Sequence, residues 1–363
     1  MWLVGFLLVL GPLVMVHEFG HYLVGRAFGV KADAFSVGFG KEIAGFTDRR
    51  GTRWKLSALP FGGYVQFAGD MNPASQPSEE WLSLSPAERA KTFQAKALWQ
   101  RALIVAAGPV TNFLVAVAIF AAFNFAYGKV VLPPVAASIE AGSEAAKLGI
   151  APGDRFVSVN GETIDSFEQL ATRVIANPGA RLHLVVEHQG ALRQLDFVIP
   201  SVVESDNFGN KGRIGRLGVY GVKGKLVPVG AGEAVTLGFR QTGEKIELMV
   251  DGLWQIVTGR RAVDELGGPL KIAKYSGEQL SLGWLNFVGF VALISINLAF
   301  INLLPIPALD GGHLAFYAAE AVRRKPASPR SQEWAFRTGI AFVLALMLFV
   351  TINDIVSLPI FGR

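Results

Sequence analysis

The sequence contains no cysteine among its 363 residues, and charged residues make up only 17% of it. The absence of cysteine excludes a disulfide framework and thiolate metal sites, so a bound metal must be held by His, Asp or Glu. Soluble domains carry about 25% charged residues, whereas 51% of this chain is hydrophobic. This composition excludes a disordered chain and argues against a purely soluble globule. Glycine follows no period of three, which excludes a collagen-like chain.

Four runs of the chain are almost free of charge and long enough to cross a bilayer, which needs about 20 apolar residues. They cover residues 2–24, 102–127, 284–309 and 338–358. The first has no basic residue before it and no small-residue cleavage site after it, so we expect a retained span rather than a signal peptide. The sequence predicts a multi-pass α-helical membrane protein with four transmembrane helices.

The rest of the chain falls between these spans. The roughly 155 residues between the second and third spans are too many for a loop, and we expect an α+β domain there, followed by a connector. The predicted segments are 1–28 (first span), 29–100 (cytoplasmic segment with a membrane-associated β-hairpin), 101–128 (second span), 129–222 (inserted domain), 223–283 (amphipathic connector), 284–312 (third span), 313–334 (cytoplasmic loop) and 335–363 (fourth span).

Lysine and arginine concentrate in the segments 31–101 and 323–337, and the extreme amino terminus has none. Because short cytoplasmic loops are enriched in these residues, both segments should be cytoplasmic. Both termini and the inserted domain should then lie outside. The net charge of +5 is explained by this topology. No basic stripe with interleaved aromatics indicates a nucleic-acid partner, and the predicted partner of the surface is the lipid bilayer.

The first span carries an H-E-x-x-H motif, His17-Glu18-Phe19-Gly20-His21. Residues i and i+4 share one face of a helix, so both imidazoles can bind one Zn²⁺ while Glu18 reaches a water on it. Ionisable residues inside a span are costly unless they coordinate, pair or line a wet cavity. The alternative is a polar patch that packs helices without a metal.

A third ligand is expected, because a catalytic zinc normally has three protein ligands and water. The best candidate is Asp310, in the segment 302–313, N-L-L-P-I-P-A-L-D-G-G-H. The first and third spans must cross in the same direction, so Asp310 emerges on the side of His17 and His21. His313 is a competing candidate. In the alternative interpretation, the two prolines simply end the span and Asp310 caps the next helix.

These residues carry a family resemblance. The H-E-x-x-H of the first span, the A-G-P-x-x-N that begins at Ala107 and the N-x-x-P-x-P-x-L-D-G-G of the third span resemble bacterial site-2 proteases of the RseP type. The order of elements is similar over nearly the whole chain. The resemblance implies an intramembrane zinc metalloprotease of the inner membrane, with His17, His21 and Asp310 as zinc ligands and Glu18 as general base. It also implies that Asn302 contacts the substrate backbone or the developing oxyanion.

The same resemblance implies the substrates. They are single-span membrane proteins already shortened by another protease, typically anti-sigma factors in a stress response; remnant signal peptides are a further option. The segments 35–40 and 59–67 alternate apolar residues with glycine, which predicts strands. In the family these regions resemble a membrane-reentrant hairpin that clamps an extended substrate, with Gly62, Gly63 and Tyr64 as predicted substrate contacts. An ordinary cytoplasmic hairpin is the alternative.

The segment 141–199 predicts a short helix, a Pro-Gly turn, a strand, an Asn-Gly turn, a strand, a helix capped by Ser166 and two further strands. With a Gly-rich strand at 214–222, it resembles a PDZ domain. Such a domain could bind extended peptides, or could sterically exclude substrates with a bulky external part. We favour the steric role, because Arg216 is the one basic residue near the loop that would bind a carboxylate. Relatives often carry two such domains, and this chain has room for one.

The function that best fits the sequence is thus intramembrane zinc proteolysis. The rival hypothesis is a catalytically silent membrane scaffold that recruits partners through its inserted domain. It predicts no bound metal and no loss of function when Asp310 is replaced.

Overall fold

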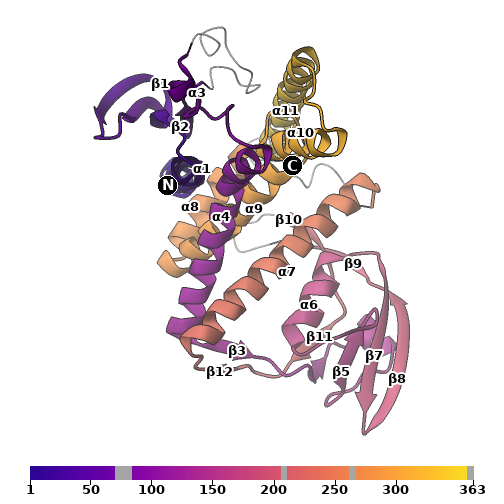
Figure 1. Cartoon of the computed structure of the whole chain (residues 1–363). Helices are drawn as coiled ribbons and strands as arrows, with labels where there is room; N and C mark the ends of the chain where they lie inside the picture. The colour runs from indigo at the N-terminus through magenta and orange to yellow at the C-terminus, as the bar shows by residue number, and fades with distance from the viewer. Residues whose placement is uncertain (70–83, 206–210, 261–266, 358–363) are drawn as a thin grey trace. The chain divides into compact units, whose positions relative to one another are not determined.

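The computed structural model describes residues 1–69, 84–205, 211–260 and 267–357 (Figure 1). It divides into two compact units, which we describe separately. The membrane unit comprises Met1–Phe120, Gly238–Met249 and Ala262–Arg363, and the β-rich unit comprises Ala121–Leu237 and Val250–Arg261. Parts of the predicted cytoplasmic segment (70–83) and of the fourth-span segment (358–363) lie outside the described residues.

Four described helices are long and apolar enough to cross a membrane, as the sequence predicts. They are α1 (Trp2–Ala27), α4 (Leu98–Tyr127), α9 (Trp284–Leu303) and α11 (Pro329–Ser357). The helices α1 and α9 share a buried cluster of Val9, Leu13, Phe287 and Ile294. The third span ends earlier than the predicted residue 309, because the prolines at 305 and 307 interrupt the helix. A short loop follows, and α10 (Asp310–Arg323) begins directly after it.

The predicted hairpin is present as β1 (Ala32–Thr47) and β2 (Arg53–Phe67), which pair antiparallel. Both strands bend, and residues 34–37 of β1 pair with residues 63–66 of β2 on one side and with 53–56 on the other. Four segments therefore lie side by side, in the order 63–66, 34–37, 53–57 and 42–47. Gly38 and Gly62 adopt the left-handed conformation at the bends (φ 88° and 91°), where a side chain would be strained. The short helix α3 (Pro86–Arg89) lies between the hairpin and α4.

The connector forms two helices, α7 (Ala231–Val257) and α8 (Pro269–Ser281). The sequence predicts that α7 lies on the membrane surface or against the inserted domain. Residues Ile246 and Met249 of α7 pack with a buried cluster of α4 and α9, and nearer its end Gln255 donates a hydrogen bond to Asn177 of the β-rich unit at 2.9 Å. The helix α8 lies so close to α1 that a Cβ on Gly5 would be 2.8 Å from the backbone of Ser276. The amino terminus of α8 is held by Asp354 of α11, which is fully buried and accepts hydrogen bonds from the amides of Gly268, Leu270 and Lys271.

The β-rich unit contains a four-stranded sheet in the order β6–β5–β7–β8, with α6 packed against it (Figure 1). Its elements are β3 (Lys129–Val131), β4 (Ala136–Ile139), α5 (Glu144–Lys147), β5 (Arg155–Val159), β6 (Glu162–Thr163), α6 (Phe167–Ala176), β7 (Arg181–His188), β8 (Ala191–Val198), β9 (Ser201–Ser205), β10 (Lys211–Gly215), β11 (Val219–Gly221) and β12 (Lys225–Val227). Three strand pairs complete it: β9 with β10, β4 with β11, and β3 with β12.

The local predictions for this unit hold in most places. Asn160 and Gly161 form the predicted turn, both with positive φ, and Ser166 caps α6 through the amide of Gln169. The predicted single strand at 214–222 is wrong. The chain breaks into β10 and β11 there, because Gly218 adopts a left-handed conformation (φ 81°) between them, and β11 pairs with β4.

Candidate metal centre

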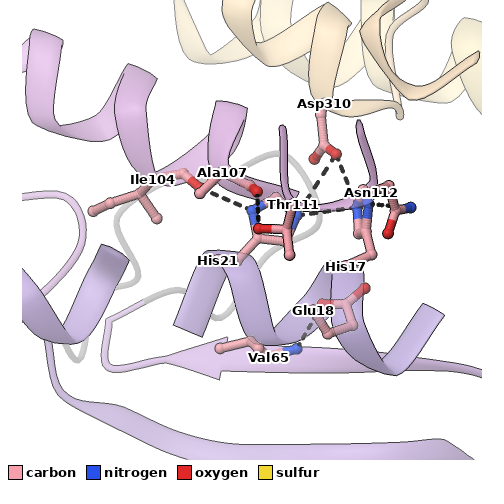
Figure 2. A network of polar contacts seen from close by, with 9 residues as sticks. All are labelled: His17, Glu18, His21, Val65, Ile104, Ala107, Thr111, Asn112 and Asp310. Carbon is pink, nitrogen blue, oxygen red and sulfur yellow. Dashed lines mark hydrogen bonds and ion pairs between the residues drawn. The ribbon is translucent and has the colours of Figure 1, made fainter. Parts of the chain in front are cut away.

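The H-E-x-x-H motif lies on α1, within the first span. Its two histidines are one helical turn apart, as the motif requires (Figure 2). His17 is buried, and both imidazoles point toward Asp310 at the start of α10. The Nε2 atoms of His17 and His21 lie 3.2 Å apart, and Oδ2 of Asp310 lies 3.1 Å and 3.6 Å from them. The common direction of the first and third spans therefore brings these three side chains together.

The three atoms are well placed to surround one cation. Each can offer a lone pair, and Oδ2 of Asp310 is buried without a hydrogen-bond donor among the described residues. Zinc binds nitrogen and oxygen at about 2.0–2.2 Å, so the ligand atoms of a tetrahedral site lie roughly 3.3 Å apart. The three observed separations bracket this value. The residues present fit a zinc ion.

The second span contacts both imidazoles. Nδ1 of His21 lies 2.8 Å from the carbonyl oxygen of Ile104, and Nδ1 of His17 lies 3.4 Å from the side-chain amide of Asn112. The bond to Ile104 requires the proton of His21 to be on Nδ1, which leaves its Nε2 lone pair free for a metal. Between these contacts, a Cβ on Gly108 would lie 2.3 Å from Nε2 of His21. The glycine of A-G-P-x-x-N is thus needed for clearance at the ligand atoms.

Glu18 contacts the hairpin rather than a helix. Its Oε2 accepts a hydrogen bond from the backbone amide of Val65 at 3.1 Å (Figure 2). Val65 lies on the segment 63–66, which forms one edge of the four-segment arrangement. The glutamate of the motif therefore joins the metal centre to a sheet edge.

The loop before α10 positions Asp310. Ala308 adopts a positive φ of 86°, which is rare for a residue other than glycine, Asn or Asp and is typical of functional sites. Asp310 is the first residue of α10, whose N-cap is Leu309, so the capping alternative is wrong. Gly311 and Gly312 allow α10 to pack on the loop, because a Cβ on either would lie within 2.4 Å of a carbonyl oxygen. Arg101 of α4 pairs with Glu320 at 3.1 Å and links the second span to α10.

A cavity of about 340 Å³ opens beside the three ligand atoms. It is lined by the motif residues, by Asp310 and Asn302, by Val65 and Phe67 of β2, and by apolar residues of the spans. The predicted contacts Gly62, Gly63 and Tyr64 lie on the same strand but do not line it. His313 does line it, and burial lowers its pKa, which favours the neutral form. Among the described residues, however, the group of potential ligands that converge is His17, His21 and Asp310.

Sequence reasoning missed two contacts of this centre, those of Asn112 and Val65. The A-G-P-x-x-N motif gave a signal for the first, since it places a buried amide in a span. Nothing in the local pattern around Val65 marks its amide as the partner of Glu18.

The model of peptidase family M50 matches residues 5–346 of the chain. The chain belongs to peptidase family M50. The match covers all three sequence motifs of the site.

Several bacterial relatives resemble the chain over nearly its full length. A protein of Agrobacterium fabrum named "Putative zinc metalloprotease Atu1380" is 44% identical over 98% of this chain and 96% of its own length. A relative with a name of the same form, from Rhizobium meliloti, is 43% identical over 96% of this chain and 95% of its own. "Metalloprotease MmpA" of Caulobacter vibrioides is 33% identical over 99% of this chain and 96% of its own length. This M50 member is therefore a zinc metalloprotease and a membrane protein.

Among solved structures, the PDZ domain of an SdrC-like protein from Listeria monocytogenes matches 26% of this chain and 90% of its own length. The identity is 18% and the TM-score is 0.20. A score this low adds no argument about the fold. Over residues 141–199 the order of elements, α5, β5, β6, α6, β7 and β8, is that expected from the sequence.

Proposed function

We propose that this M50 member is an intramembrane endopeptidase in which His17, His21 and Asp310 hold the zinc and Glu18 is the general base. The observation that carries the proposal is the convergence of three lone-pair atoms from α1 and α10 within 3.6 Å, beside a glutamate and a cavity. Buried acceptors without donors persist where a cation satisfies them. A packing role would need an imidazole Nε2 to donate to Asp310, whereas the bond of His21 to Ile104 places the proton of His21 on Nδ1.

The chemistry then follows from the positions of the side chains. When bound, zinc polarises the scissile carbonyl and lowers the pKa of the attacking water. Glu18 accepts the proton of that water and returns it to the leaving nitrogen. Asn302 lines the same cavity, from where its amide can donate a hydrogen bond to the carbonyl oxygen as negative charge develops on it. Apolar side chains of the spans limit the access of bulk water.

A substrate helix must become extended before this site can cut it, because its peptide bonds are shielded by their own hydrogen bonds. The edge segment 63–66 offers backbone groups on which an extended peptide can pair. Such a peptide would bring a carbonyl to the amide of Val65 and release Glu18 from its present hydrogen bond. Strand addition then both positions the substrate and frees the base. Gly62, Gly63 and Tyr64 continue the same strand and are the proposed flanking contacts.

The proposed substrates are single-span proteins that have already lost their bulky external part, of the anti-sigma-factor type, with remnant signal peptides as a second class. The β-rich unit would act as a size filter. In support, Arg216, the one basic residue near the loop that would bind a peptide carboxylate, already pairs with Glu140 at 3.2 Å. In this proposal both termini and this unit lie outside the bacterial inner membrane and the active site faces the cytoplasm, which the basic segments 31–101 and 323–337 support.

The test is cleavage of a model single-span substrate by the full chain in proteoliposomes, together with its zinc content. Glu18→Gln should retain zinc and lose activity by about 10²–10⁴-fold, the usual contribution of a general base. Glu333→Gln is the matched control, because Glu333 lies exposed near the start of α11 and pairs with Arg337. Undiminished cleavage by Glu18→Gln would favour the scaffold hypothesis.

The size filter needs a separate measurement. Substrates that differ only in their external part, a short tail or a fused folded domain, are compared with the same enzyme. The short form should be cut and the fused form resisted. Equal cleavage rates for both forms would contradict the steric role of the β-rich unit. They would not bear on the proposed zinc site.

A further inference from the structure

We infer that Asn112 is a positioning residue for the zinc site: its side-chain oxygen accepts the Nδ1 proton of His17 and thereby fixes the tautomer that can bind metal. The inference rests on the proposed zinc ligation by His17, His21 and Asp310. It assigns a function to the last position of the A-G-P-x-x-N motif.

The burial of Asn112 makes its hydrogen bonds consequential. The residue is fully buried (0% exposed) in the second span, and its amide nitrogen lies 3.4 Å from Nδ1 of His17. Its Oδ1 has no hydrogen-bond partner among the described residues. A buried acceptor without a donor is destabilising. In this orientation the nitrogen of the side-chain amide has a hydrogen-bond partner and the oxygen has none.

A rotation of the amide by 180° exchanges its two ends: Oδ1 then faces His17, and the end without a partner among the described residues is the NH2 group. The oxygen and nitrogen of an Asn side chain are assigned from their hydrogen bonds, since they occupy nearly the same space. With the oxygen toward His17, it accepts a proton from Nδ1, and the unpaired acceptor gains a donor. The reverse placement would have the amide nitrogen donate to Nδ1. That donation forces the His17 proton onto Nε2, where it would point at the other two ligand atoms.

The contact of His21 gives that residue the corresponding tautomer. Its Nδ1 bonds to a carbonyl oxygen, that of Ile104, which can only accept. His21 is therefore protonated on Nδ1 and has its Nε2 lone pair free. With Asn112 rotated, His17 has the same tautomer, and both Nε2 lone pairs face Oδ2 of Asp310. One helix then orients both imidazoles, His21 through a main-chain carbonyl and His17 through a side-chain carbonyl.

The backbone around Asn112 is fixed on both sides. Its own carbonyl accepts a hydrogen bond from the hydroxyl of Ser295 on α9 at 2.7 Å. Gly108, one turn earlier, lies against the two Nε2 atoms. The backbone that carries the side chain is thus fixed by a contact with the third span.

The experiment compares Asn112→Leu with Asn112→Asp in the purified full chain in detergent. Zinc affinity is measured by competition with a chromophoric chelator, and the unfolding temperature of the zinc-free protein is measured in parallel. Groups that orient metal-bound histidines contribute roughly 10–100-fold to metal affinity. Asn112→Leu should weaken zinc binding by that factor, whereas Asn112→Asp, which keeps an acceptor, should remain within a few fold of the unmodified chain.

Asn124→Leu is the matched control, because Asn124 is a second buried asparagine of the same helix, more than three turns away from Asn112. It should leave zinc affinity unchanged and report the general cost of this substitution in a span. A merely structural role of Asn112 predicts equal zinc affinity in the Leu and Asp variants, with any loss confined to the unfolding temperature; that result would overturn the inference. If Asn112→Leu does not fold, reduced affinity in Asn112→Asp overturns it as well.

One further variant separates this inference from the proposed function. His17→Ala should lose zinc whatever the function of Asn112. If His17→Ala retains zinc, the proposed ligand set is wrong. If it loses zinc while Asn112→Leu binds as tightly as the unmodified chain, only the inference about Asn112 is wrong.

Discussion

Both units of this protein contain histidine side chains close to an aspartate, but the two arrangements differ in the number of acceptor atoms that they bring together. In the membrane unit, two imidazoles and Asp310 converge with their acceptor atoms together. In the β-rich unit, Nδ1 of His188 lies 2.5 Å from Oδ1 of Asp154, while the other oxygen of Asp154 accepts the amide of Ala151. A single imidazole beside a single carboxylate forms a hydrogen bond and needs nothing else. Three potential ligand atoms that converge in one buried place can instead surround a cation, as we propose for this site. The number of converging lone pairs distinguishes a metal site from a structural pair.

The largest expected difference comes from removing each aspartate. Asp310→Ala should lose zinc and reduce proteolysis by at least about 10³-fold, since the metal contributes several kcal/mol to the transition state. Asp154→Ala should keep zinc and full activity on a short substrate, and should destabilise the β-rich unit by about 1–3 kcal/mol through its unpaired partners. Metal analysis and thermal unfolding of both variants test this. Zinc loss in Asp154→Ala would contradict the distinction.

A second prediction concerns clearance at the ligand atoms. Gly108→Ala introduces a Cβ 2.3 Å from Nε2 of His21 and 2.8 Å from Nε2 of His17. The imidazoles must shift, and a displacement of about 1 Å at a catalytic site can reduce activity by about 10²-fold. Gly11→Ala is the control, because a Cβ at that position of α1 meets no atom within 4 Å. Activity and zinc content are measured for both; equal behaviour of the two variants would show that Gly108 is not needed for clearance.

A smaller effect is expected at the sheet edge. Val65→Pro removes the amide that bonds Glu18 and that we propose to pair with the substrate. We expect kcat/KM to fall about tenfold, which corresponds to one hydrogen bond to a charged or polarised acceptor. Zinc content should not change. Val65→Ala keeps the amide and serves as the control, and a tenfold loss in that variant would assign the effect to the side chain instead.

The smallest effect belongs to the exposed pair of the β-rich unit. His183 on β7 lies opposite Asp196 on β8, and its Nδ1 is 2.9 Å from the carboxylate. Exposed pairs contribute little, so His183→Gln should change the free energy of unfolding by no more than about 0.5 kcal/mol. Chemical denaturation of the full chain measures it. Loss of zinc or activity in this variant would be incompatible with the separation of the two units.

The sequence predicts much of this architecture because its strongest signals are local or topological. Long apolar runs define the spans, the i and i+4 spacing places His17 and His21 on one face, and the common direction of two spans predicts that Asp310 joins them. Turn residues such as Asn160 and Gly161 locate the strands of the inserted domain. Each of these inferences needs either a short periodic pattern or a count of membrane crossings.

The remaining contacts could not be predicted in the same way. The bond between Glu18 and the amide of Val65 joins residues 47 positions apart, and that between His17 and Asn112 joins residues 95 apart. Neither contact produces a periodic pattern in the sequence. The folding of β1 and β2 into four adjacent segments depends on bends at individual glycines, which alternation alone does not locate. The packing of α7 against α4 and α9 depends on Ile246 and Met249 facing other helices, whereas amphipathicity indicates only that one face is buried.

The fourth span contributes none of the residues that line the cavity, yet it holds two parts of the site in place. A Cβ on Gly339 would lie 1.9 Å from the carbonyl oxygen of Pro307, in the loop that leads to Asp310. Asp354 caps α8, which packs on the helix that carries the histidines. During synthesis, both contacts form only after the last span has been made and inserted. A chain that ends before residue 339 already contains every proposed zinc ligand. It lacks the contact of Gly339 with that loop and the cap that Asp354 gives to α8. The loop before Asp310 and the amino terminus of α8 therefore acquire these neighbours only once α11 has been made.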